Sequence, residues 1–352
     1  MKSALISGIT GQDGAYLAKF LLRKGYKVFG TYRRLSTPNF WRLKYLGIYD
    51  KTDLIPIDLA DHSSLIEAIK IAEPDEIYHL AAQSFVEASF QTPYSTGLIT
   101  GLSTTSFLEA VRQIKLDAKF YFAATSELYG FSSTDDSSLN ENHQFKPMSP
   151  YAAAKLYSYW INKIYREGYR MFASAGILFN HESPLRGLEF VTRKIVNSLA
   201  RIKFGLSKEL AMGNLEARRD WGYAPEYVEA MYQILNCDRP DDFVIATNET
   251  HSVREFLELA GSMMNLNYAD YLRIDKSLMR PLDLPSLKGD YSKAKEILGW
   301  EPKTDFKELV RIMVNEEVRN MERLIKGELF PWDTQLYNEE VEEVMKGVSN
   351  GK

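Results

Sequence analysis

Residues 4–14 read Ala-Leu-Ile-Ser-Gly-Ile-Thr-Gly-Gln-Asp-Gly, an apolar run that leads directly into a Gly-x-x-Gly-x-x-Gly turn. The run predicts a buried strand, and the amphipathic stretch after the turn predicts a helix that stops at Gly25. Glycines between a strand and a helix let the backbone approach a pyrophosphate held at the helix N-terminus. A purely structural turn is the alternative. Because strand, turn and helix all fall in place, the pattern predicts a dinucleotide site at Gly8, Thr10, Gly11, Gln12, Asp13 and Gly14.

Short apolar runs and amphipathic stretches alternate through the first half of the chain. Further strands are expected at 27–31, 54–57, 76–80, 120–124 and 173–179, and helices at 64–72, 103–114 and 151–169. This alternation is typical of a parallel sheet with helices on both faces. The fold class is therefore α/β, with a Rossmann-like doubly wound parallel sheet.

The second half is less regular and predicts a smaller mixed α/β substrate-binding lobe. Its expected helices span 191–204, 225–235, 253–264 and 306–324, with a strand at 243–246. We expect the dinucleotide-binding domain to span 1–180 plus about 222–250, the lobe 181–221 and 251–330, and a C-terminal tail 331–352.

The composition excludes several classes of protein. The chain has 352 residues, 45% hydrophobic and 26% charged, as expected of a soluble globular protein. A net charge of -4 gives no general attraction to nucleic acid or to an anionic membrane, so neither partner is expected. The single cysteine excludes an intrachain disulfide, and with five scattered histidines no metal site is expected. The apolar start is too short for a signal peptide, so we expect a cytoplasmic location.

A candidate redox and proton-transfer centre lies near the middle of the chain. Thr125, Ser126 and Glu127 follow the strand expected at 120–124, and Tyr151 and Lys155 lie one helical turn apart. Ser149 and Pro150 are typical of a helix start, which places Tyr151 in the first turn. Tyrosine has an unperturbed pKa of about 10, and an ammonium and a helix N-terminus both favour its phenolate. Glu127 supplies a second base, although a solvated loop acid is its alternative interpretation.

The Tyr-x-x-x-Lys pattern alone is weak evidence, because this chain has 21 tyrosines and shows it three times. The copies are Tyr151/Lys155, Tyr159/Lys163 and Tyr291/Lys295. Only Tyr151 combines a helix start with an acid at a preceding strand end. We therefore expect the other two pairs to be structural.

The ends of the next strands indicate which dinucleotide binds. An acid after the second strand would hold an unsubstituted ribose, but the sequence there offers Arg33 and Arg34. Arginine suits a 2'-phosphate, so NADP is the expected cofactor, with an exposed basic loop as the alternative. The third strand is followed by Asp58 and Leu59 on the adenine side, and the fourth by Leu80, Ala81, Ala82, Gln83 and Ser84 on the nicotinamide side. Ordinary packing at a strand end is the alternative for each.

These motifs together resemble the extended short-chain dehydrogenase/reductase superfamily and, within it, the GDP-mannose 4,6-dehydratase family. The glycine turn and the Tyr-Lys pair indicate only the superfamily. The narrower likeness depends on two longer blocks, Asn-His-Glu-Ser-Pro-Leu-Arg-Gly at 180–187 and Arg-Arg-Asp-Trp-Gly at 218–222. The family pattern differs at 97–105 and at 282–285, which bears on the guanosine contacts and on assembly.

The resemblance implies a catalytic role for four residues. Tyr151 would deprotonate the sugar 4-hydroxyl, with Thr125 hydrogen-bonded at O4 and Lys155 on the nicotinamide ribose. Glu127 would remove the C5 proton and protonate the departing 6-hydroxyl, giving GDP-4-keto-6-deoxy-D-mannose. Ser126 stands where dTDP-sugar dehydratases carry an aspartate, which favours GDP-sugars. A reductase or epimerase of a related GDP-sugar, such as a heptose, and a non-catalytic dinucleotide-binding scaffold remain alternatives.

The resemblance also implies binding residues and partners. Ser95, Lys155, His181 and Arg186 would join the cofactor site, with Arg186 a candidate for a contact across subunits. GDP-mannose is the implied substrate, and a homodimer or homotetramer is expected. The implied substrate ligands are Gln83, Ser84, Ser126, Asn180, Val191, Lys194, Asn214, Arg219 and Arg280.

Overall fold

The computed structural model describes residues 1–37, 39–132, 138–279, 284, 286–328 and 330. The prediction for Arg280 and the tail 331–352 lie outside these residues.

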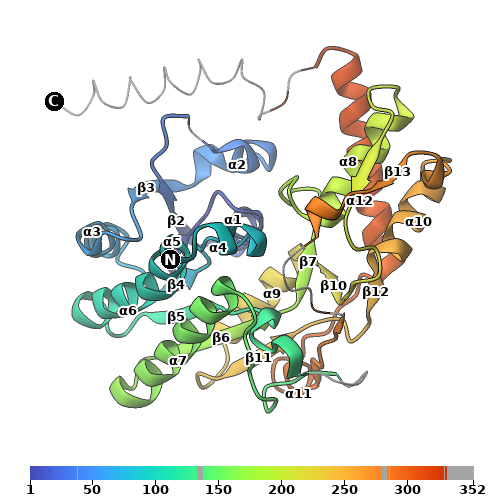
Figure 1. The fold of residues 1–352 in the computed structure, drawn as a ribbon. Helices are drawn as coiled ribbons and strands as arrows, with labels where there is room; N and C mark the ends of the chain where they lie inside the picture. The colour runs from blue at the N-terminus through green and yellow to red at the C-terminus, as the bar shows by residue number, and fades with distance from the viewer. Residues whose placement is uncertain (38, 133–137, 280–283, 285, 329, 331–352) are drawn as a thin grey trace.

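A seven-stranded sheet forms the centre of the molecule, in the order β11-β6-β5-β4-β1-β2-β3 (Figure 1). Every neighbouring pair in it is parallel. This order reverses direction beside β1, so the expected doubly wound parallel sheet is confirmed. The strands are β1 (Ser3–Ser7), β2 (Lys27–Arg33), β3 (Asp53–Ile57), β4 (Glu76–His79), β5 (Lys119–Ala123), β6 (Ala173–Leu178) and β11 (Asp242–Ile245).

Helices cover both faces of the sheet because its strands bury alternate side chains in two separate cores. Leu5 belongs to one core and Ile6 to the other. The first face carries α3 (His62–Ala72), α6 (Ser103–Ile114) and α7 (Pro150–Tyr169). The second carries α1 (Gln12–Arg23), α9 (Ala224–Leu235) and α11 (Ser292–Leu298), with α2 (Trp41–Tyr45) beside α1. No helix in the described parts of the chain is long and apolar enough to cross a membrane.

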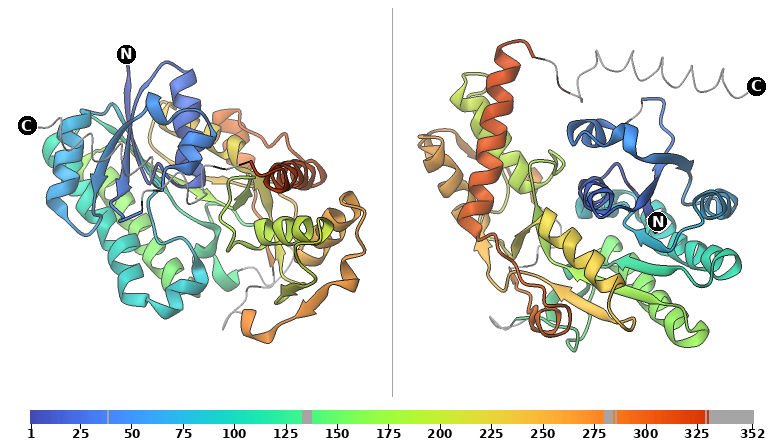
Figure 2. Two further views of the ribbon diagram at one scale, coloured as in Figure 1. Left: turned by 90° about the horizontal axis from the view of Figure 1, so that it is seen from above. Right: turned by 180° about the vertical axis from the view of Figure 1, so that it is seen from behind.

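A smaller lobe stands beside the sheet, with its own apolar core (Figures 1 and 2). Its helices are α8 (Val191–Lys203), α10 (Val253–Met263) and α12 (Phe306–Ile325). Short strands complete it: β7 (Asn180–Glu182) pairs with β10 (Trp221–Tyr223), β8 (Leu210–Met212) with β13 (Leu272–Ile274), and β9 (Arg218–Arg219) with β12 (His251–Ser252) and β14 (Ser286–Leu287). The mixed α/β lobe thus has the expected character.

The packing suggests one change to the expected domain boundaries. Ala294 and Trp300 are buried in the core formed with β11 and α9, and the indole nitrogen of Trp300 donates to the Glu226 carbonyl at 3.0 Å. We therefore propose that residues 290–300 belong with the dinucleotide-binding domain, and that the rest of the expected division holds.

Candidate active site

The candidate residues gather at the carboxyl edge of the sheet, because parallel strands present all their C-terminal ends on one side. The turn after β1, the arginines at the end of β2, and the segments after β4, β5 and β6 all emerge there. The strand order reverses between β1 and β4, and open α/β sheets bind their ligands at the carboxyl ends of the strands beside such a reversal. The sequence predictions therefore meet in one place.

The glycine turn is built as expected. The amide nitrogens of Gly8 and Ile9 both donate to the Thr31 carbonyl at 3.2 Å, which fixes the turn against β2. A Cβ on Gly14 would lie 2.4 Å from the Gly8 carbonyl oxygen, so the helix can follow this closely only without a side chain. Among the described residues, no side chain caps α1, whose first amides point to the sheet edge.

Two side chains of this turn clasp the beginning of the second lobe. Asp13 Oδ2 lies 2.8 Å from Nε2 of His181 on β7, and Gln12 Nε2 donates to Asp13 Oδ1 at 3.0 Å. Gln12 Oε1 also accepts from the Ser183 hydroxyl at 2.7 Å. Burial by itself would raise the pKa of Asp13, but the charge and hydrogen bond of His181 lower it to about 2. The structure thus places His181 beside the glycine turn, and its role in cofactor binding stays a prediction.

The helix start before Tyr151 is confirmed. The Ser149 hydroxyl accepts from the Ala152 amide at 3.1 Å, and Pro150 occupies the first turn of α7. Tyr151 and Lys155 are both buried, at 8% and 4% exposure. Lys155 Nζ donates to the Ala123 carbonyl at 2.6 Å and lies 5.9 Å from the centre of the Tyr151 ring. The end of β5 therefore fixes the lysine beneath the tyrosine.

The electrostatics of this pair differ from the expectation of a favoured phenolate. Burial raises the pKa of Tyr151, while a hydrogen bond from Thr125 works in the opposite direction. Burial also lowers the pKa of Lys155 to about 7, although the Asp13 carboxylate raises it. In this structure desolvation outweighs the helix terminus, since a buried site penalises both charged forms. The protonation states of Tyr151 and Lys155 therefore depend on burial and on neighbouring charges as well as on each other.

Thr125 and Glu127 stand at the end of β5, next to this pair. The Thr125 hydroxyl accepts from the Glu127 amide at 3.3 Å and caps the short helix η3 (Ser126–Leu128). Ser126 is buried, at 2% exposure. The Glu127 charge acts on the Tyr151 hydroxyl by raising its pKa. The four predicted catalytic residues are thus in one cluster.

The other cofactor candidates lie around the same edge. Arg33, the last residue of β2, and Arg34 after it are exposed, with no ion pair to a described residue. Asp58 accepts from the Ala60 amide at 2.9 Å, and Ser95 is exposed on α5 (Pro93–Thr96). The Ser7 hydroxyl accepts from the amides of Leu80 and Ala81 at 3.2 Å and so holds the segment 80–84. In that segment Gln83 Oε1 is buried without a hydrogen-bond partner in the described structure, and Ser84 is exposed.

The substrate candidates come from the second lobe. Asn180 begins β7, while Val191 and Lys194 stand in the first turns of α8. Burial lowers the pKa of Lys194, although Asp275 and Glu87 oppose the shift. Asn214 accepts from the Glu216 amide at 2.9 Å. Arg219 is buried, and its Nη1 donates to the carbonyls of Arg218 and Leu284, so part of its guanidinium serves the lobe itself.

Arg186 has partners within its own chain, and the expected contact across subunits stays a prediction. It forms an ion pair with Glu182 of its own chain at 3.2 Å, and its guanidinium stacks 3.7 Å from the centre of the Phe190 ring. Its charge lowers the pKa of Tyr151. Its charge therefore acts on the catalytic cluster.

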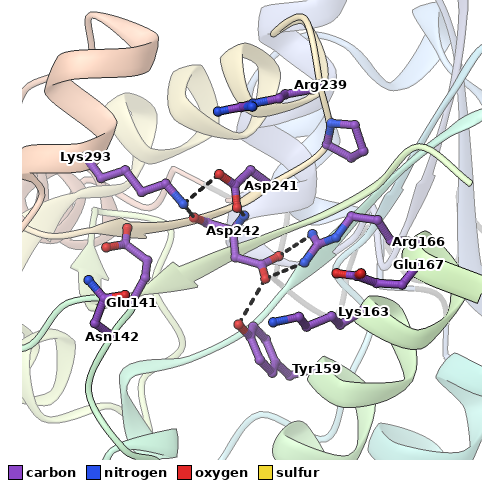
Figure 3. A pocket seen from close by; sticks show the side chains of 11 residues that line it. Glu141, Asn142, Tyr159, Lys163, Arg166, Glu167, Arg239, Asp241, Asp242 and Lys293 are labelled. Atoms are coloured by element: carbon purple, nitrogen blue, oxygen red, sulfur yellow. Dashed lines mark hydrogen bonds and ion pairs between the residues drawn. The ribbon is translucent and has the colours of Figure 1, made fainter. Parts of the chain in front are cut away.

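The other two Tyr-x-x-x-Lys pairs have structural surroundings. Tyr159 donates to Asp242 at 2.9 Å, and Lys295 pairs with Glu301 at 2.5 Å. Tyr159 lines a polar cavity of about 500 Å³ at the other end of α7 (Figure 3). There Arg166 pairs with Asp242 and Lys293 with Asp241, each at 2.8 Å. Because these charged side chains pair with one another, the polar lining of the cavity has a structural role.

Sequence reasoning missed Ser7 and Ser183, whose hydroxyl groups hold other residues of the site in position. Ser7 orients the segment after β4, and Ser183 ties Gln12 to the second lobe. A polar residue that ends the otherwise apolar β1 was the available signal for Ser7. Ser183 lies in the block at 180–187 that indicated the family, but its contact with Gln12, 171 residues away, could not be seen in the sequence.

The comparisons with known proteins agree with this site. The family model described as GDP-mannose 4,6 dehydratase matches residues 5–313. The chain is 47% identical to "GDP-mannose 4,6 dehydratase 2" of Arabidopsis thaliana, covering 92% of this chain and 88% of that one. It is 46% identical to "GDP-mannose 4,6 dehydratase" of Homo sapiens, covering 90% and 92%.

Solved structures share the fold at lower identity. A UDP-glucose 4-epimerase of Thermotoga maritima superposes with a TM-score of 0.81 at 22% identity, covering 90% of this chain and 99% of that one. At that identity the likeness extends to the fold alone, whereas the sequence relatives match nearly end to end. With the acid, tyrosine and lysine in one cluster, the chain thus belongs to the GDP-mannose 4,6-dehydratase family.

Proposed function

We propose that this chain is an NADP-dependent GDP-mannose 4,6-dehydratase, which converts GDP-α-D-mannose to GDP-4-keto-6-deoxy-D-mannose and water. Glu127 carries the proposal, because it adds a second base beside Tyr151 and Lys155 at one sheet edge. Oxidation alone needs one base. A second base that can remove the proton at C5 is what elimination of the 6-hydroxyl requires after C4 is oxidised.

The residues present fit NADP. The glycine turn leaves no room for side chains near the first amides of α1, where a pyrophosphate would lie. Arg33 and Arg34 offer guanidinium groups for a 2'-phosphate, and the orphaned Gln83 Oε1 and Thr31 Oγ1 are buried acceptors at the strand ends. When bound, NADP would supply the hydride acceptor for C4 and the donor for C6.

The chain's own residues handle the protons. Tyr151 takes the proton of the 4-hydroxyl, and Thr125, hydrogen-bonded to the tyrosine, holds O4. The C4 ketone acidifies C5. Glu127 then removes the C5 proton and passes it to the 6-hydroxyl oxygen, which leaves as water. C5 takes up a proton again when C6 is reduced, and the proton that Tyr151 took from the 4-hydroxyl balances this last step. Burial of Tyr151 and Lys155 keeps solvent out of this exchange.

The second lobe would hold the nucleotide sugar. Lys194 is half-buried and interacts electrostatically with a carboxylate of each lobe, Glu87 and Asp275. Its ammonium group can therefore face a diphosphate held between the lobes. We assign Asn180, Val191, Asn214 and Arg219 to the same side and Gln83, Ser84 and Ser126 to the sugar side.

Incubation of the purified protein with GDP-mannose, without added NADPH, tests the proposal. The expected result is a 6-deoxy-4-keto product identified by NMR, with no net change in the NADPH absorbance. Stoichiometric NADPH oxidation would instead indicate a reductase. No conversion by protein that holds NADP would contradict the assignment. A parallel reaction with a GDP-heptose separates the two sugar classes.

We also infer that the protein forms a homo-oligomer through an apolar surface on α5, η2 (Gly97–Leu102) and α7. Tyr94, Leu102, Trp160 and Ile164 are exposed there, and beside them lies a groove of about 320 Å³ with no charged lining residue. A second copy is its expected occupant, because a two-fold axis brings the same apolar helices face to face. Leu102→Glu should yield monomers in light scattering, whereas Leu206→Glu should not, because Leu206 is exposed on the second lobe, at 45% against 54% for Leu102.

A further inference from the structure

The hydrogen bonds of His181 determine its protonation state. Nδ1 lies 2.7 Å from the Phe179 carbonyl oxygen, and Nε2 lies 2.8 Å from Asp13 Oδ2. A carbonyl oxygen and an ionised carboxylate accept hydrogen bonds and cannot donate them, so both ring nitrogens must carry a proton. A protonated Asp13 would be the alternative, but the Gln12 amide donates to its other oxygen and favours the charged form. The ring is therefore an imidazolium.

The surroundings of this ring contain few other charges. Asp13 faces it from α1, Arg186 acts on it from the loop after β7, and the Tyr227 ring of α9 stacks on it at 4.6 Å between centres. Although burial disfavours the charged ring, Asp13 raises the pKa of His181. Histidine and aspartate side chains are only 10% and 23% exposed, so solvent screens their attraction weakly.

Asp13 also acts on the catalytic pair. Its charge raises the pKa of both Tyr151 and Lys155. An uncompensated carboxylate at this position would make the tyrosine a poorer acid and would hold the proton of the lysine. The positive charge of His181 opposes this field.

We propose that Asp13 is a positioning residue that holds His181 as an imidazolium, and that the resulting neutral pair sets the charge felt by Tyr151 and Lys155. The same pair ties the cofactor turn to β7, so the balance depends on both lobes being in place. The kinetic part of the proposal rests on the proposed function, whereas the protonation state of His181 does not.

The protonation state is tested on the protein without nucleotide, by NMR with ¹⁵N-labelled histidine. His181→Gln identifies the signal. We expect two protonated ring nitrogens at pH 7 to 8 in the wild type and one, Nδ1, in Asp13→Asn. A single protonated nitrogen in the wild type at pH 7 would overturn the proposal, whether or not the protein has dehydratase activity. If His181→Gln does not fold, single substitutions of the other four histidines identify the His181 signal by elimination.

The charge balance is tested by the pH dependence of kcat/KM. His181→Gln should move the acidic limb to higher pH by about one unit or less, because it leaves the buried Asp13 carboxylate uncompensated. Asp13→Asn should leave the limb close to its wild-type position, because the His181 ring then loses its second proton and both charges of the pair disappear together. The double variant should return the limb toward the wild type. An unchanged limb in His181→Gln, or a shift of the limb in Asp13→Asn as large as that in His181→Gln, would overturn the proposal, because the effect would then not come from an uncompensated Asp13 carboxylate.

His251→Gln is the matched control. His251 pairs with Glu255 at 2.8 Å in the second lobe, so the substitution removes a histidine from another carboxylate pair. The acidic limb of the kcat/KM profile should stay at its wild-type pH in this variant. A shift equal to that of His181→Gln would overturn the assignment of the effect to the Asp13 pair.

Discussion

At the residue scale, the two bases of the site divide the reaction between them. Tyr151→Phe should abolish cofactor reduction in a single turnover, because no base takes the 4-hydroxyl proton. Glu127→Gln should still permit reduction but block loss of water, because only the C5 base is removed. Rapid absorbance measurements at the NADPH band check both. Tyr291→Phe, in another Tyr-x-x-x-Lys pair, should behave as the wild type, and equal loss of reduction in both site variants would refute the division.

Arg33 is predicted to select the cofactor. Arg33→Ala removes an exposed guanidinium at the end of β2 and should weaken NADP about tenfold or more, since hydrogen bonds to charged groups contribute about 1.5–3 kcal/mol. NAD, without the 2'-phosphate, should bind almost unchanged. Titration calorimetry with both dinucleotides gives the comparison. Arg23→Ala, exposed at the end of α1, is the control, and a parallel loss of NAD affinity would exclude the 2'-phosphate role.

Lys155 is predicted to make stability depend on pH. Its pKa is about 7 in the folded protein because of burial, against an ordinary value near 10.5 in the unfolded chain. Between these values the unfolded state binds more protons, so this group raises the free energy of unfolding as pH increases. Lys155→Met should therefore stabilise the protein more at pH 7 than at pH 9.5 in urea denaturation without nucleotide. A gain that grows with pH would contradict the lowered pKa.

At the scale of the element, the start of α7 connects local sequence to the site. Ser149 caps the helix, so Ser149→Ala should cost about 1 kcal/mol of unfolding free energy and loosen the first turn that carries Tyr151. Ser149→Asp keeps a capping oxygen and should retain most of both stability and activity. Urea denaturation and kcat measure the two effects. Equal stability of the alanine and aspartate variants would show that the cap contributes nothing.

Element ends were predictable where their causes are local. The Ser149 cap and Gly25, which has a positive φ of 83°, are set by a few neighbouring residues. The bounds of α6 also agree with the expected 103–114, although no side chain caps its start, which continues from η2. The segment η2 did not follow a local signal: it is a π-helix that joins α5 to α6 and packs on α7. Its wider turn depends on contacts with the neighbouring helix.

At the scale of the whole molecule, the two lobes are joined by the clasp of Gln12, Asp13, His181 and Ser183. The catalytic pair lies on the sheet side, and the groups assigned to the diphosphate lie on the other. The reaction therefore requires both lobes to be folded and held in the correct position relative to each other. The placement of residues 290–300 against α9 also belongs to this scale, because Ala294 and Trp300 find their partners only in the assembled core.

The sequence by itself determined the sheet class, the glycine turn, the helix start at Tyr151 and the family, because apolar periodicity, capping residues and long motifs are all written in neighbouring positions. Tertiary structure alone decided the charge of the site. The lowered pKa of Lys155 comes from burial, and the imidazolium of His181 depends on a carboxylate 168 residues away. Desolvation and distant pairing are properties of the folded chain, so no local pattern could reveal them.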